Sequence, residues 1–293
     1  MAYFRNNSTN QVLGGKIYVV RKSSILIKVN GLGPGGRPLI IKPNPGHIVS
    51  IKQKSIPNQA EQTLIITGNE IGSAVLYGYV DLGSNSALPG CPPAQHKFTG
   101  CISPLFVEVV PSMELPDPNT EAGIIARMLI AENITPDDPF ERYKEEDSLK
   151  SMQWMLIALE NRMTFSHPHL LQVPSSAASL SSIIRSGGVV QGFKSYPNIG
   201  STQQATIDKV EKRANLGTDG KFLQYRKYMQ NAISVAKKEK TGVDPCPTKI
   251  YAWVTAGSPF PSANFVKFIT FAGQDFYTLR QEFIDDPLQR KKK

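Results

Sequence analysis

The chain has 293 residues, of which 40% are hydrophobic and 19% are charged. This length and composition exclude a wholly disordered chain and suit one large or two ordinary globular domains, each with its own core. The formal net charge of +9 favours an anionic partner, such as nucleic acid, a membrane surface, or a cell envelope rich in phosphate and carboxylate groups. Because the basic residues are scattered, apart from short clusters at 237–240 and 290–293, we expect no nucleic-acid partner.

Cysteine and histidine usage predicts neither a metal site nor a dense disulfide framework. Cys91 and Cys101 bracket a short loop that one disulfide closes if the chain reaches an oxidising compartment; two free thiols are the alternative. Cys246 is left over. His167 and His169 occur in a proline-broken loop with no partner pair nearby, so we expect no metal and no cofactor.

The start of the chain lacks the basic residues, apolar core and cleavage site of a secretory signal, and no run of 18 apolar residues occurs. We therefore expect synthesis in the cytoplasm without a signal peptide, and no transmembrane segment. If the substrate lies outside the membrane, the protein needs a route that uses no signal peptide.

Residues 1–112 predict an all-β sandwich, because short alternating runs rich in β-branched residues are separated by glycine and proline turns. The runs occupy residues 16–20, 25–29, 48–51, 63–67, 74–79 and 105–110. The last Val-rich runs resemble the closing strands of bacterial Ig-like modules, which implies a spacer or adhesive role. Prolines mark a linker at 113–120, where Asn119 or Thr120 can cap the next helix.

Residues 121–285 predict a mainly helical domain, and residues 286–293 a basic tail. We expect helices at 121–133, 147–163, 203–215 and 220–240, and short extended segments with turns between 251 and 279. The predicted fold class is therefore multidomain, with an N-terminal all-β Ig-like sandwich and a C-terminal mainly α domain.

The first predicted helix carries a carboxylate on its apolar face. At helical spacing, Ile125, Met128, Leu129 and Glu132 share one face, so Glu132 is expected to be buried. A carboxyl group held against apolar neighbours has a raised pKa and can stay protonated near neutrality, as a general acid requires. The alternative is a half-exposed helix end whose charge is solvated.

The order of motifs across residues 121–197 resembles the SleB-type cell-wall hydrolases. The family pattern is met, in chain order, by the apolar helix to Glu132, by Asn161-Arg162, by residues 180–185, and by Gln191 and Phe193. After Glu132 the chain reads Asn-Ile-Thr-Pro where the family has Ala-Arg-Gly-Glu. The resemblance implies a lysozyme-like helical fold that cleaves the glycan strands of peptidoglycan, with Glu132 as the catalytic acid.

Amide groups and aromatic faces suit glycan recognition, and they define the substrate-binding candidates. These are Asn161, Arg162, Gln191, Phe193, Tyr196 and Trp253. Core packing is the default interpretation of the aromatic residues. For Asn161 and Arg162 the alternative is a polar helix end that hydrogen-bonds the next loop.

Glycoside cleavage normally uses two carboxylates. The polar loop after Glu132 offers candidates for the second one, unless the loop is simply a solvated acidic segment. They are Asp137, Asp138, Glu141, Glu145, Glu146 and Asp147. A lytic transglycosylase needs only one acid, because the 6-hydroxyl of the substrate attacks. The sequence leaves hydrolysis and transglycosylation open.

Together these features predict an antibacterial effector that a contractile apparatus such as type VI secretion delivers to the target-cell periplasm, with a cognate immunity protein in the producer. A phage-encoded lytic protein fits the same features. One rival is a non-enzymatic binding or structural protein, such as a tail or baseplate component. An enzyme of the peptide stems is disfavoured, because no cysteine lies beside a plausible histidine.

Overall fold

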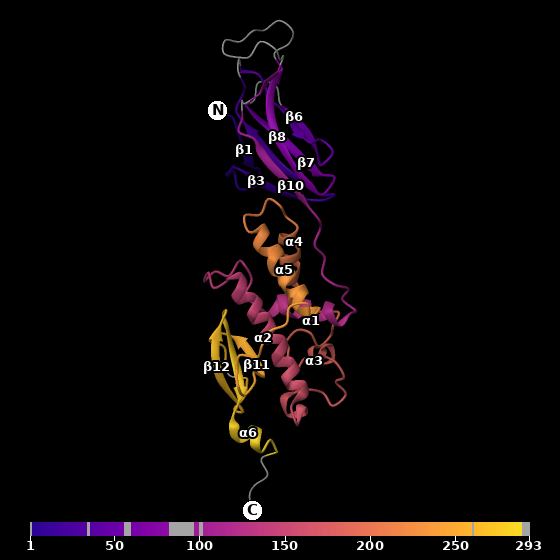
Figure 1. Ribbon diagram of the computed structural model, residues 1–293, viewed down its shortest axis with the longest axis vertical. Coiled ribbons are helices and arrows are strands. Elements are labelled where there is room, and N and C mark those ends of the chain that lie inside the picture. The colour runs from indigo at the N-terminus through magenta and orange to yellow at the C-terminus, as the bar shows by residue number, and fades with distance from the viewer. Residues whose placement is uncertain are drawn as a thin grey trace, which may run out of the picture. The chain divides into compact units, whose positions relative to one another are not determined.

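The computed structural model describes residues 2–33, 36–55, 60–81, 97–99, 102–259 and 261–288. The chain divides into two compact units, each with its own elements (Figure 1). The first unit comprises Met1–Ser112 with the short segment Asn215–Phe222, and the second comprises Met113–Ala214 with Leu223–Lys293. Cys91 and Cys101, which carry the predicted disulfide, lie outside the described residues, as does the end of the predicted basic tail.

The described part of the first unit forms two sheets. Their strands are Tyr3–Asn6 (β1), Val12–Leu13 (β2), Lys16–Val20 (β3), Ser24–Asn30 (β4), Ile40–Asn44 (β5), Val49–Ser55 (β6), Glu61–Gly68 (β7), Gly72–Asp81 (β8), Lys97–Thr99 (β9) and Leu105–Val110 (β10). One sheet has the order β2-β1-β4-β7-β6; the other has the order β3-β10-β8-β5, with β9 beside β8. The pairs are antiparallel except β10 with β3, which is parallel.

The two sheets of the first unit share one apolar core. Val19, Ile27, Leu64, Leu76 and Leu105 belong to a single cluster and are 0% exposed. Successive side chains of a strand point to opposite faces, so the alternation in the sequence leaves one face of each sheet in the core and the other outside. The outward face of the β1-β4-β7-β6 sheet therefore carries polar and charged residues together with the exposed apolar side chains of Leu26 and Ile65.

The second unit contains helices and a third sheet. The helices are Glu121–Glu132 (α1), Glu145–Thr164 (α2), the 3₁₀ helix Pro168–Leu171 (η2), Leu180–Ser186 (α3), Ser201–Ala214 (α4), Phe222–Ala236 (α5) and Gln281–Asp285 (α6). The strands are Ala252–Thr255 (β11), Phe265–Phe271 (β12) and Gln274–Leu279 (β13), in the order β11-β13-β12 with antiparallel pairing. Among the described residues, no helix is long and apolar enough to cross a membrane.

The predicted fold class is wrong, because the second unit is mixed rather than mainly helical. Described strands run from Tyr3 to Leu279 and form three sheets, and β11 packs beside α2 (Figure 1). The β12–β13 hairpin turns through Ala272 and Gly273, both at positive φ. Short extended segments were expected between 251 and 279, but a sequence does not show which of them pair into a sheet that covers the helices.

Helix α1 runs through the middle of the second unit's core. Its side chains from Ile124 to Ile130 are 0–1% exposed apart from Arg127, so the helix is enclosed on nearly every side. The side chain of Thr120 caps the helix by accepting a hydrogen bond from the N–H of Gly123 at 3.1 Å. Because α1 is enclosed in this way, the residues at its C-terminal end lie in or next to the interior of the unit.

Candidate functional site

Glu132 is the last residue of α1, and a buried asparagine ends the helix behind it. Asn133 has an extended backbone, although its N–H still donates to the carbonyl of Leu129. From Nδ2, Asn133 donates to the carbonyl oxygen of Ser148 at 3.0 Å and to its Oγ at 3.1 Å. Because Asn133 is 5% exposed, these bonds tie the end of α1 firmly to the first turn of α2.

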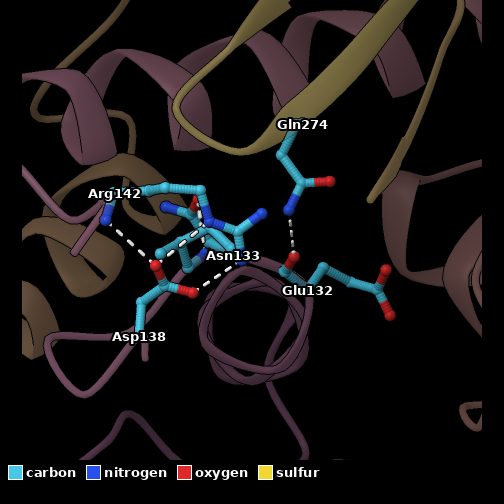
Figure 2. A network of polar contacts seen from close by, with 6 residues as sticks. Glu132, Asn133, Asp138, Arg142 and Gln274 are labelled. Atoms are coloured by element: carbon cyan, nitrogen blue, oxygen red, sulfur yellow. Dashed lines mark hydrogen bonds and ion pairs between the residues drawn. The ribbon is translucent and has the colours of Figure 1, made fainter. Parts of the chain in front are cut away.

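The last carbonyl groups of a helix lack helical partners, and here side chains from distant parts of the chain supply donors. The hydroxyl of Tyr228 on α5 lies 3.1 Å from the carbonyl oxygen of Ile130 and 3.2 Å from that of Asn133. Gln274 on β13 donates from Nε2 to the carbonyl oxygen of Glu132 at 2.9 Å (Figure 2). The helix end that carries Glu132 is therefore held by α5 and β13.

The carboxyl group of Glu132 is partly buried and points away from the neighbouring Asp138–Arg142 ion pair (Figure 2). Burial raises its pKa from 4.5 to about 7, because removal from water disfavours the charged form. A hydrogen bond donated by the side chain of Trp253 on β11 acts in the opposite sense and lowers this pKa. At neutrality such a group exists in both forms, so it can give up a proton or take one.

The two aspartates that follow α1 are committed to ion pairs. Asp137 accepts from Lys209 at 2.8 Å and also from Arg213. Burial raises the pKa of Asp137, but hydrogen bonds from Lys209 and Tyr225 and the charge of Arg213 outweigh burial and lower it to about 2. Two side-chain bonds from Arg142 likewise lower the pKa of Asp138.

A cavity of about 320 Å³ lies beside the end of α1. Its lining consists of Ala131, Asn133, Ile134, Thr135, Asp137, Asp138, Pro139, Thr206 and Lys209. Glu132 is not part of this lining, although both its neighbours are, so its carboxyl group does not open into the cavity. The remaining acidic candidates, Glu141, Glu145, Glu146 and Asp147, lie in the loop and the first turn of α2, where the carboxylates at 145–147 face the positive end of the helix dipole.

Asn161 and Arg162 donate hydrogen bonds to the backbone carbonyls of the segment that directly precedes β11 in the chain. Asn161 donates from Nδ2 to Asp244 at 2.7 Å and to the carbonyl of Ile250 at 2.8 Å. Arg162 is 6% exposed and donates from Nε to the carbonyl of Tyr251 and from Nη1 to that of Leu171 at 2.9 Å. Burial lowers the pKa of Arg162 to about 10. These two side chains therefore hold the segment that leads into the strand of Trp253.

The remaining sugar-binding candidates lie in the segment after α3. Phe193 is 0% exposed and belongs to the core, so in this conformation its ring offers no surface to a sugar. Its ring stacks on that of Tyr196 with the ring centroids 6.3 Å apart, and the Tyr196 hydroxyl donates to the carbonyl oxygen of Pro118 at 2.7 Å. Gln191 is exposed. The structure thus brings Trp253 to Glu132, while Phe193 and Tyr196 pack on the core and on the linker.

Tyr228 and Gln274 were not among the predicted site residues. Gln274 is 1% exposed and its Oε1 is buried without a hydrogen-bond partner. Both residues reach the end of α1 only through the tertiary fold, and nothing in their sequence neighbourhoods marks them. Within the described ranges, no cluster of histidine, cysteine or carboxylate side chains is suited to a metal ion. Cys246 is buried as a free thiol.

Comparisons with known proteins add little. No family model and no curated protein matches this chain. Among solved structures, domains 4 and 5 of the S-layer protein SbsC align at 14% identity over 33% of this chain and 48% of theirs, with a TM-score of 0.22. Domains 1–6 of SbsC align at 14% identity over 36% of this chain and 13% of theirs, with a TM-score of 0.24. The alignments thus span less than half of those structures, and a likeness this low carries no argument.

Proposed function

We propose that this protein cleaves the glycan strands of peptidoglycan and that Glu132 is the general acid. The observation that carries the proposal is the partly buried carboxyl group of Glu132, whose pKa is raised to about 7. A glycosidase acid must hold its proton near neutrality and release it to the oxygen of the leaving sugar. The Trp253 indole beside this group adds an aromatic face of the kind that sugars bind.

The ion-paired state of Asp137 and Asp138 favours a route with one carboxylate. In that route Glu132 protonates the glycosidic oxygen as the bond from C1 to that oxygen breaks. The 6-hydroxyl oxygen of the same sugar then bonds to C1, and its proton passes to the Glu132 carboxylate, which restores the acid. No water is consumed, and the product is an anhydro sugar. Hydrolysis requires a second group that activates water.

The substrate lies outside the cytoplasmic membrane, and this location sets the partners that we propose. We propose that the protein acts in the periplasm of a target cell, after delivery by a contractile secretion apparatus such as type VI. A cognate immunity protein then protects the producer. These proposals rest on the chemistry of the substrate and on the resemblance to cell-wall hydrolases, and they stand only if the cleavage activity does.

The test is digestion of purified sacculi, with mass spectrometry of the released muropeptides. We expect the wild type to release anhydro-muropeptides and Glu132→Gln to release at least a hundredfold less, since general acid catalysis contributes about 10²–10⁴-fold. Glu121→Gln is the matched control, because Glu121 is exposed at the opposite end of the same helix. Reducing ends would establish hydrolysis. Intact sacculi with the wild type would overturn the proposal and favour a non-enzymatic binding or structural protein.

A further inference from the structure

Positive charge is concentrated in the first part of the chain. Residues 1–112 contain ten lysines and arginines and four aspartates and glutamates, which leaves a net charge of +6. The remaining 181 residues contribute only the other +3 of the total of +9. The part of the chain that holds no proposed catalytic group is therefore its more cationic part, and an asymmetry of this kind points to an anionic partner.

Much of this charge lies on the outward face of one sheet. Strand register aligns Arg5 on β1 with Lys28 on β4, Lys28 with Thr63 on β7, and Thr63 with Lys54 on β6. Strands are about 4.8 Å apart, so this row extends roughly 14 Å across the sheet. A second row lies two residues along the strands and consists of Leu26, Ile65 and Lys52. We call these seven residues the cationic face.

The four cations of the cationic face differ in how accessible they are to a partner. Lys52 and Lys54 are exposed, and Leu26 and Ile65 are each 39% exposed. Lys28 and Arg5 are half-buried and already have partners: Lys28 pairs with Glu61 at 2.8 Å, and Arg5 donates from Nε to the carbonyl of Asn10 at 3.1 Å. Because successive side chains of a strand point to opposite faces, the two rows project from the same side of the sheet.

We propose that the cationic face binds the carboxylate groups of peptidoglycan and so anchors the protein to the polymer that its second unit cleaves. This inference rests on the proposed function, and it concerns a second contact with the same substrate. The stem peptides of peptidoglycan carry carboxylates at irregular spacing along a flexible polymer. The two exposed cations of the face, Lys52 and Lys54, are lysines, which are mobile point charges and adapt to such spacing better than the rigid fork of arginine.

Two other anionic partners fit the face less well. A membrane surface is bound through an extended apolar face, whereas Leu26 and Ile65 are the two apolar members of this face and its other five residues are polar or charged. Single-stranded nucleic acid is bound by several aromatic side chains on which successive bases stack, whereas the two rows contain none and Tyr3, two residues from Arg5 on β1, adds one ring on this side of the sheet. A second contact also makes the cutting reaction effectively intramolecular, which raises the local concentration of glycan at the site.

The experiment is co-sedimentation of the full chain with intact sacculi, in the Glu132→Gln background so that the polymer is not digested. We expect Lys52→Glu with Lys54→Glu to weaken binding about tenfold at low salt, because individual exposed charge contacts are weak but four units of charge change on one face. Binding should also fall as salt rises from about 50 to about 300 mM, which screens exposed charges. The matched control, Lys42→Glu with Lys237→Glu, makes the same change in net charge at exposed positions elsewhere.

Equal losses in both double variants, or unchanged binding by the first, would overturn the proposal. Tighter binding of the parent protein to phosphatidylglycerol vesicles or to single-stranded DNA than to sacculi would overturn it as well. The variant Lys52→Gln with Lys54→Gln removes two positive charges without adding negative ones. On a logarithmic scale it should weaken binding to sacculi about half as much as the double glutamate variant does, which separates loss of attraction from introduced repulsion. Binding by an inactive protein and release of muropeptides by the wild type are separate measurements, so the proposed function and this inference can fail independently.

Discussion

Replacement of Trp253 by phenylalanine should extend the activity of the protein toward alkaline pH. The Trp253 side chain donates a hydrogen bond that favours the charged form of Glu132 and so lowers a pKa that burial has raised. Phenylalanine keeps an aromatic ring but has no donor. Without the bond the charged form loses stabilisation, and Glu132 should hold its proton to a higher pH.

The size of the shift follows from the strength of the lost bond. Hydrogen bonds to charged groups contribute about 1.5–3 kcal/mol, and one pKa unit corresponds to about 1.4 kcal/mol. Glu132 is only partly buried, so the lower end applies, and the pKa should move from about 7 to about 8. At pH 8 the wild type would keep roughly a tenth of its acid in the protonated form, and the variant roughly half.

The assay is the pH dependence of muropeptide release, together with ¹³C NMR titration of the Glu132 carboxyl carbon. Trp154→Phe is the matched control, because Trp154 is the other tryptophan of the chain and packs on Phe271 with ring centroids 4.5 Å apart. We expect Trp154→Phe to leave the alkaline limb of the pH–activity profile unchanged. If Trp253→Phe leaves the limb and the titration unchanged, or if the wild-type carboxyl titrates near 4.5, the account of this acid is refuted.

Three further substitutions test the surroundings of the site. Because the folded-state pKa of Glu132 lies above its ordinary 4.5, the stability that the protonated group contributes is complete below pH 4.5 and is lost as pH rises through about 7. Urea unfolding should therefore show Glu132→Gln to be about 2–3 kcal/mol more stable than the wild type at pH 8 and equal to it at pH 4. Identical unfolding curves for the two proteins at both pH values would contradict the burial of Glu132. Arg162→Leu deprives two backbone carbonyls of a buried donor and should cost about 3 kcal/mol or more; a loss below about 1 kcal/mol would show that water replaces the guanidinium. Gly273→Ala should lower stability by about 1–2 kcal/mol in thermal unfolding, because φ is +74° and the added Cβ meets Ile134 at 2.6 Å, whereas Gly14→Ala, with open space around it, should change little.

The elements near the site were largely predictable because their signals are local. The sequence predicted a helix at 121–133 capped by Asn119 or Thr120, and α1 spans Glu121–Glu132 with Thr120 as the cap. The second helix was expected at 147–163 and spans Glu145–Thr164. Periodicity and capping depend on residues a few positions apart, so a single chain displays them.

The contacts of the site were not predictable in the same way. Asn161 and Arg162 were chosen as substrate-binding candidates, and the structure adds that each donates to a backbone carbonyl 89 positions away in the chain. Gln274 donates to the carbonyl of Glu132 across 142 positions. Polar residues of this kind have no periodic signal, because their partners are set by how the elements pack and not by their neighbours in sequence.

The sequence by itself determined where α1 begins and ends, that its last side chain is a carboxylate, and that the strands before the linker alternate between an inner and an outer face. Only the tertiary structure decided that the segments between 251 and 279 pair into a third sheet, which brings Trp253 and Gln274 to Glu132. The pKa of a carboxyl group depends on the water that the rest of the fold removes from it. That amount is a property of packing between distant segments, and no local pattern contains it.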